Sequence, residues 1–240
     1  MEQTFMKEKK ILPLVLSMSL PMMLSMLVNS LYNIVDSYFV AQISEQAMTA
    51  LSLVYPLQLL ETAIAVGFGI GMNAAAAYYL GAKEQQRADD IVTSGLILSL
   101  LHGVILMAAA LLFAPVFVSL FTENEKILAD GVKYSNLVFV FAVPNVIAIT
   151  FEKIFQAEGR MKVSMFSMLC GCVANIILDP LLIFGIGIFP KMGIEGAAIA
   201  TGIGQVIPLI VYLFIFIKHP VALHFHWHKK AFQKRLVGQM

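Results

Sequence analysis

Long uncharged apolar stretches constrain this chain more than any other feature. Six stretches contain no Asp, Glu, Lys or Arg: 11–35, 62–82, 91–122, 134–151, 163–178 and 196–217. An α-helix needs about 20 apolar residues to cross a bilayer, so each stretch is long enough, or nearly so, to form one span. The stretches are continuous rather than alternating, which favours helices over a membrane β-barrel.

The overall composition supports the same fold class. Charged residues make up 13% of the 240 residues and hydrophobic residues 59%, whereas a soluble protein has about 25% charged residues. The 16 basic and 15 acidic residues nearly cancel, so no net field points to a nucleic-acid partner. We therefore predict an all-α, polytopic membrane protein. Its six spans are expected near 12–40, 46–80, 92–120, 132–156, 163–187 and 196–217.

The distribution of Lys and Arg predicts the orientation of these spans. Most basic residues lie in the N-terminal segment, the second–third loop, the fourth–fifth region and the C-terminal tail. In a chain with six spans, these four segments lie on the same side of the membrane. The other side carries only Lys126, Lys133 and Lys191. By the positive-inside rule, both ends of the chain are expected in the cytoplasm, with the chain passing several times through the inner (plasma) membrane.

Three carboxylates fall well inside the predicted spans: Asp36, Glu61 and Asp179. An ionisable residue at membrane depth is costly and usually marks a cavity or an ion path. Asp36 and Asp179 both lie towards the outer ends of helices that run in the same direction, so they could meet in the outer half of the membrane. Glu61 has no polar stripe around it, and a buried hydrogen bond between helices is its simpler role.

Polar neighbours accompany the two aspartates. The first span carries a polar stripe along one helical face, made of Ser25, Asn29, Tyr32, Asn33 and Asp36. On the fifth span, Asn175 shares a face with Asp179, and Pro180 disturbs the backbone beside it. Such oxygens suit a hard monovalent cation such as Na⁺, while repulsion between close carboxylates would favour a proton. The sequence leaves both open, and ordinary roles as a helix cap or a helix end remain alternatives.

Five segments, in order along the chain, resemble the multidrug and toxic compound extrusion (MATE) transporters. They are Leu31-Tyr32-Asn33-Ile34-Val35-Asp36-Ser37-Tyr38-Phe39-Val40, Gly67 to Gly81 with Ala82, Gln156-Ala157-Glu158-Gly159-Arg160, Asn175-Ile176-Ile177-Leu178-Asp179-Pro180-Leu181-Leu182-Ile183, and Gly193-Ile194-Glu195-Gly196-Ala197-Ala198-Ile199-Ala200-Thr201. The Asn-x-x-x-Asp-Pro element is most similar to the prokaryotic DinF-like branch.

The resemblance implies a cation-coupled (Na⁺ or H⁺) antiporter, not an enzyme, that exports organic, often cationic, drugs by alternating access between two six-helix lobes. It implies no cofactor besides the coupling ion. In that branch the cation site of the amino-terminal lobe falls on Asp36, Asn175, Asp179 and Thr201. The polar stripe residues Asn29, Tyr32 and Asn33 are then expected to line the substrate cavity.

The resemblance also implies a missing partner, because the family has twice as many spans. Residues 1–218 would form the amino-terminal lobe, and residues 219–240 a cytoplasmic linker towards a second six-helix lobe. The chain would be either a fragment or a half-size protein that dimerises.

Two other functions use the same features. A lipid-linked sugar flippase of the same superfamily would be expected to line its cavity with several Arg or Lys for pyrophosphate, and we expect none within these spans. A membrane-embedded aspartyl enzyme could use Asp36 and Asp179 as an acid/base pair. Intramembrane aspartyl proteases carry Tyr-Asp and Gly-x-Gly-Asp patterns, and neither Asp36 nor Asp179 lies in such a pattern.

Overall fold

The computed structural model describes residues 10–219 and 221–225, and this part of the chain is helical, with no strand. The helices are α2 (Ile11–Ala41), α3 (Glu45–Gly81), α4 (Gln85–Ser119), α5 (Glu125–Val140), α6 (Ala142–Ala157), α7 (Met161–Phe184) and α8 (Ile194–Lys218). Five of them are long and apolar enough to cross a bilayer, and α5 with α6 makes a sixth, bent span. The predicted all-α, polytopic fold class is confirmed. Parts of the expected N-terminal segment and linker, residues 1–9, 220 and 226–240, lie outside the described residues.

The fourth span is broken rather than continuous. We expected one helix near 132–156, but α5 begins earlier, at Glu125, and meets α6 at an angle of 47°. Pro144 lies in the first turn of α6, where it has no N–H for the preceding helix and would clash with a carbonyl group one turn earlier. The ring of Phe141, at the break, lies directly against Gly202 of α8.

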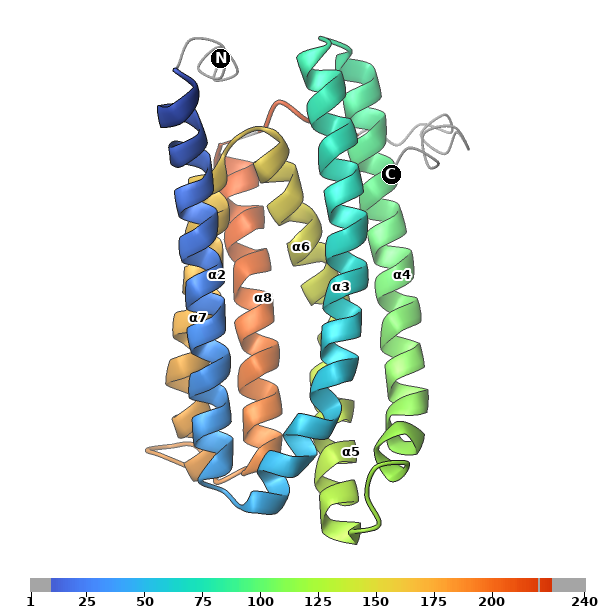
Figure 1. Cartoon of the computed structure of the whole chain (residues 1–240), viewed down its shortest axis with the longest axis vertical. Coiled ribbons are helices and arrows are strands. Elements are labelled where there is room, and N and C mark those ends of the chain that lie inside the picture. The colour runs from blue at the N-terminus through green and yellow to red at the C-terminus, as the bar shows by residue number, and fades with distance from the viewer. Residues whose placement is uncertain (1–9, 220, 226–240) are drawn as a thin grey trace.

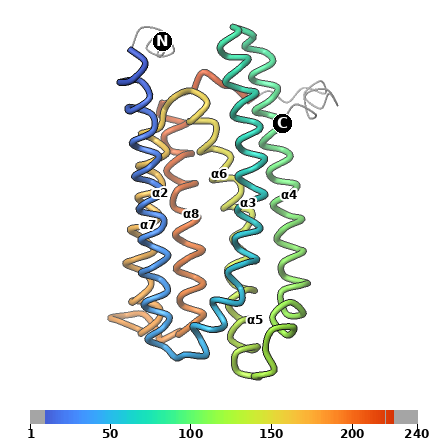
Figure 2. The backbone as a smooth tube through the Cα atoms, in the orientation of Figure 1, coloured from blue at the N-terminus to red at the C-terminus, as the bar shows by residue number. Residues whose placement is uncertain are grey.

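The helices form two groups that meet along α8 (Figure 1). α2 packs on α7 and α7 on α8, while α3 packs on α4 and α6. α5 and α6 also contact α8 and so join the groups, whereas α2 and α3 make little contact. Figure 2 shows that α2 begins and α8 ends at the same end of the bundle, beside the α3–α4 and α6–α7 turns. We call this the basic end, because Lys83, Arg87 and Arg160 lie there.

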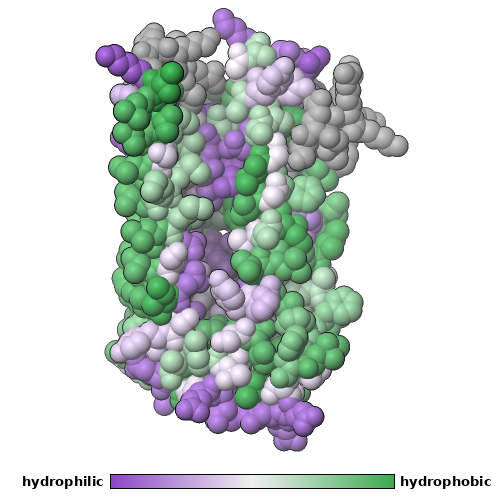
Figure 3. Space-filling view, in the orientation of Figure 1, coloured by the Kyte–Doolittle hydropathy of each residue, from purple (hydrophilic) through white to green (hydrophobic). Residues whose placement is uncertain are grey.

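The outer flanks of the bundle are apolar and suit a lipid environment. Large hydrophobic side chains are widely exposed, among them Ile34 (65%), Leu112 (71%) and Phe113 (66%). Figure 3 shows green flanks over α2 and α3 and hydrophilic side chains in a hollow between them, where α8 lies behind. We call this surface the inner face. Polar groups at membrane depth must face protein or a water-filled cavity, so this face is not lipid-exposed in a folded assembly.

The α7–α8 pair is the most closely packed and carries most of the predicted site. A Cβ added to Gly171 would collide with the carbonyl oxygen of Gly204 and with the Pro208 ring, so these glycines let the two backbones approach closely. α7 also continues through Pro180 to Phe184 and ends at Gly185, whose φ is 74°. The alternative that Asp179-Pro180 ends a helix is therefore wrong.

Candidate ion-binding site

The structure brings Asp36, Asn175, Asp179 and Thr201 together from three helices. Asp36 comes from α2, Asn175 and Asp179 from α7, and Thr201 from α8. Their exposed fractions are 7%, 1%, 0% and 5%. The carboxyl groups of Asp36 and Asp179 lie within hydrogen-bonding reach of each other, an arrangement that two fully ionised carboxylates would oppose by repulsion.

Asn175 fixes the α7 half of this site. Its side-chain amide donates to Asp179 Oδ1 at 3.3 Å, one helical turn away. When the amide group is flipped, which exchanges its oxygen and nitrogen, both ends find a partner. In that orientation the nitrogen donates to Asp179 Oδ2 at 3.2 Å and the oxygen accepts from the Thr201 backbone N–H at 3.3 Å. Asn175 thus connects the aspartate to α8.

Two oxygens of the site have no hydrogen-bond partner. Asp36 Oδ1 and Thr201 Oγ1 are among the few buried side-chain atoms, in the part of the chain described, that accept or donate no hydrogen bond. A buried oxygen without a partner costs about 1–3 kcal/mol. A bound cation or proton would stabilise both oxygens, since each can act as a ligand or an acceptor.

Aromatic hydroxyl groups surround the site. Tyr134 of α5 is 1% exposed, and its hydroxyl group lies near Thr201 and Gln58, within electrostatic range of Asp36. Tyr32 lies close to both aspartates. Sequence reasoning missed Tyr134 and Gln58, because neither carries a charge nor belongs to a polar stripe.

The other residues expected in a substrate cavity lie on α2. Asn29 and Asn33 are partly buried, and Asn33 Nδ2 donates to the backbone oxygen of Asn29 at 2.9 Å and to its Oδ1 at 3.0 Å. Ser25 hydroxyl donates to the Pro21 carbonyl oxygen at 2.9 Å. The stripe is therefore satisfied largely within α2, and parts of its amides remain available to another group.

Glu61 makes the interhelical hydrogen bond that we expected. It is 6% exposed, and the Asn145 side chain of α6 donates to its Oε1 at 3.1 Å. This contact joins α3 to α6 and involves none of the residues of the candidate site.

A second polar cluster occupies α6 near the basic end. Lys153 Nζ pairs with Glu152 Oε1 at 3.0 Å and donates to Gln156 Oε1 at 3.3 Å, while Gln156 Nε2 donates to Glu152 Oε1 at 2.6 Å. The stem of Lys153 passes over Gly69 of α3, where an added Cβ would lie 2.8 Å from its Cγ. The expectation that the spans contain no basic side chain is therefore wrong, because Lys153 is only 8% exposed and lies inside a helix.

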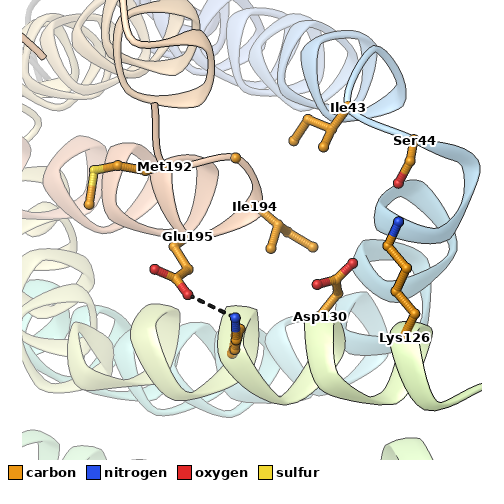
Figure 4. Close-up of a pocket in the computed structure, with 9 residues that line it drawn as sticks. Ile43, Ser44, Lys126, Asp130, Met192, Ile194 and Glu195 are labelled. Carbon is orange, nitrogen blue, oxygen red and sulfur yellow. Dashed lines mark ion pairs between the residues drawn. The ribbon is translucent and has the colours of Figure 1, made fainter. Parts of the chain in front are cut away.

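A surface pocket of about 260 Å³ lies at the opposite end of the bundle. Its lining residues are Ile43, Ser44, Lys126, Asp130, Lys133, Met192, Gly193, Ile194 and Glu195. Figure 4 shows the ion pair between Lys133 and Glu195, 3.3 Å long, which connects α5 to α8. This pocket contains none of the predicted site residues.

Comparison with known proteins places the chain in a family. The MatE family model matches residues 21–181, the region that includes α2 from Pro21 onwards, Asn175 and both aspartates. The chain belongs to the MATE family. The relatives that it matches are named as transporters or export proteins.

Curated relatives of this MATE chain are about twice as long. A protein named FAD transporter from Shewanella oneidensis is 31% identical over 206 residues, which cover 85% of this chain and 45% of the relative. A protein named multidrug export protein MepA from Staphylococcus aureus is 28% identical over 220 residues, which cover 91% of this chain and 48% of the relative. The chain therefore spans about half the length of these relatives.

Solved MATE structures have the same arrangement of helices. A multidrug resistance MATE transporter described in an outward-facing conformation matches with a TM-score of 0.86 and 26% identity, covering 94% of this chain and 49% of that one. A transporter from Pyrococcus furiosus, described as having a binding pocket of reverse polarity, matches with the same score, identity and coverage. In both cases the remaining half of the transporter has no counterpart in this chain.

Proposed function

We propose that this chain is the amino-terminal lobe of a cation-coupled antiporter that exports organic, often cationic, compounds. Asp36, Asn175, Asp179 and Thr201 bind the coupling ion, and the second lobe completes the substrate cavity. The observation that carries this proposal is the pair of unpartnered buried oxygens, Asp36 Oδ1 and Thr201 Oγ1, beside two adjoining carboxyl groups.

The site supports either Na⁺ or H⁺ as the coupling ion. Carboxylate, amide and hydroxyl oxygens are the ligands that hard cations prefer, and they suit Na⁺. A single proton shared by the two aspartates would remove their repulsion equally well. In both cases occupancy changes the charge that holds α2 against α7. Ion binding is then coupled to the packing of α2 on the rest of the lobe.

The substrate is proposed to bind on the inner face. Asn29, Tyr32 and Asn33 lie on the same polar stripe of α2 as Asp36, so ion occupancy and substrate contacts share one helix. By the positive-inside rule we place the basic end in the cytoplasm. The plasma membrane is part of the same proposal. A second six-helix lobe would cover the polar inner face and complete the path.

Replacing Asp36 tests the proposal. In membrane vesicles that contain the chain together with a second lobe, Asp36→Asn is expected to abolish gradient-driven export of a cationic dye at normal protein level. Glu61→Gln is the matched control, because it changes a buried carboxyl group outside the site and should retain export. Export by Asp36→Asn at the wild-type rate would contradict the assignment.

A second candidate substrate class is a large organic anion. Lys153 is a basic side chain within α6, and one relative, 31% identical, is named a FAD transporter. An ammonium group inside the lobe would bind an anionic phosphate group, although here Glu152 neutralises it. Lys153→Gln should then lower FAD export and spare cationic dyes, whereas Lys162→Gln, at an exposed position, should change neither. Unchanged FAD export in Lys153→Gln would exclude this class for Lys153.

A further inference from the structure

The chain beyond α8 crosses the basic end of the bundle instead of leaving it. Figure 1 shows this segment passing from the end of α8 towards the ends of α3 and α4. His219 and residues 221–225, which we call the strap, make up its described part. Val221 and Leu223 are 3% and 1% exposed, and the Phe225 ring lies 6.1 Å from Phe151 and 5.4 Å from Phe216, centroid to centroid. The strap is therefore a packed part of the lobe.

Polar side chains from two turns bind the strap backbone. Arg160 Nη1 donates to the His219 carbonyl oxygen at 3.0 Å, and the Leu223 N–H donates to Glu158 Oε1 at 3.0 Å. On α4, Gln85 Nε2 donates to the Ala222 carbonyl oxygen at 2.7 Å, and the His224 N–H donates to Asp89 Oδ1 at 2.9 Å. Hydrogen bonds to ionised groups are about twice as strong as neutral ones, so this surface is suited to an extended backbone segment.

The strap joins helices that otherwise hardly touch. α8 packs on α7, α5 and α6, whereas α4 packs on α3, α5 and α6, and the described parts of α4 and α8 have almost no direct contact. Gln85 and Asp89 lie in the first turns of α4, and the strap begins directly after Lys218, the last residue of α8. The strap is thus a direct connection between the two helix groups at the basic end.

We propose that the surface formed by Gln85, Asp89, Glu158 and Arg160 is a docking site for the strap, His219 and residues 221–225 of the same chain, and that the docked strap holds the ends of α4 and α8 at a fixed separation. The lobe then moves as one body. This inference is independent of the coupling ion and of the substrate.

Two measurements on the full 240-residue chain in lipid nanodiscs test the proposal. Amide hydrogen exchange should be slowed about tenfold or more at Leu223 and His224 relative to an unstructured peptide. Spin labels at Gln86→Cys and Lys218→Cys, both at exposed positions, should give a narrow distance distribution by pulsed electron paramagnetic resonance. Cys170→Ala and Cys172→Ala provide the background for specific labelling.

Releasing the strap should change both results. Asp89→Ala with Glu158→Ala removes the two carboxylate acceptors. Leu223→Asp instead places a charge at a buried position of the strap and leaves the helices unaltered, so it tests the proposal if the double variant does not fold. Each is expected to abolish amide protection and broaden the distance distribution, whereas Ala222→Ser should do neither. Unprotected amides in the wild type, or an unchanged distribution after release, would overturn the proposal.

Discussion

At the scale of single residues, a substitution of Thr201 can distinguish a structural role of its hydroxyl group from a role as an ion ligand. Its Oγ1 is buried without a partner, so Thr201→Val removes an oxygen that forms no hydrogen bond and should leave the free energy of unfolding unchanged or raise it by about 1 kcal/mol. If Oγ1 is a ligand of the coupling ion, the same substitution removes that ligand, and ion affinity should fall about tenfold. Paired thermal unfolding and ion-binding titrations measure both quantities.

The matched control is Thr201→Ser, which keeps the hydroxyl group and should retain ion affinity. A Thr201→Val variant that binds the ion as tightly as the wild type would remove Thr201 from the site. A large loss of stability in the same variant would instead indicate a structural hydroxyl group.

Residue identities predicted part of the site, and tertiary packing supplied the rest. The helical spacing of Asn175 and Asp179 and the position of Asp36 indicated that the three residues could meet, because a charge inside a span is rare. Thr201 followed only from the family resemblance. Tyr134 and Gln58 were missed, because a neutral polar residue carries no signal until α5 and α3 are seen beside α8.

At the scale of elements, the close contact between α7 and α8 positions the site. A methyl group at Gly171 would collide with Gly204 and Pro208, so we expect Gly171→Ala to destabilise the lobe by about 1–3 kcal/mol. Gly67 of α3 has open space around it, and Gly67→Ala should be stabilising by up to about 1 kcal/mol. Thermal unfolding in one detergent compares them. Equal effects of the two substitutions would show that the glycine contact does not hold α7 and α8 together.

The broken fourth span shows what a linear pattern cannot predict. Pro21, Pro56, Pro115, Pro180 and Pro208 all lie inside continuous helices, so a proline by itself does not predict a break. The break at Phe141 coincides with the contact between its ring and Gly202, and these two residues are far apart in sequence. Sequence reasoning missed the packing of the strap for a similar reason. Its backbone makes the hydrogen bonds to Gln85, Asp89, Glu158 and Arg160, so the strap's own residue types do not indicate them.

At the scale of the whole molecule, the inner face and the outer flank should differ in their access to water. Asn33 is partly buried on the polar stripe, whereas its neighbour Ile34 is 65% exposed and apolar. In a background without Cys170 and Cys172, Asn33→Cys should react with a water-soluble thiol reagent and Ile34→Cys should not. Mass spectrometry of labelled membranes measures both. Equal labelling at the two positions would contradict a water-filled inner face bordered by lipid-facing flanks.

The central claim is that Asp36 and Asp179 together hold one coupling cation or proton, and infrared spectroscopy of the carboxyl groups tests it most directly. In Na⁺-free buffer near neutral pH, the two adjoining groups should share a proton and give a protonated-carboxyl band that disappears in Asp36→Asn and in Asp179→Asn. Glu61→Gln identifies any contribution from the other buried carboxyl group. Loss of the band on adding Na⁺ would identify a sodium site, and its persistence a proton site. A wild-type spectrum without this band and without any response to Na⁺, or a band that both Asn variants retain, would contradict the account.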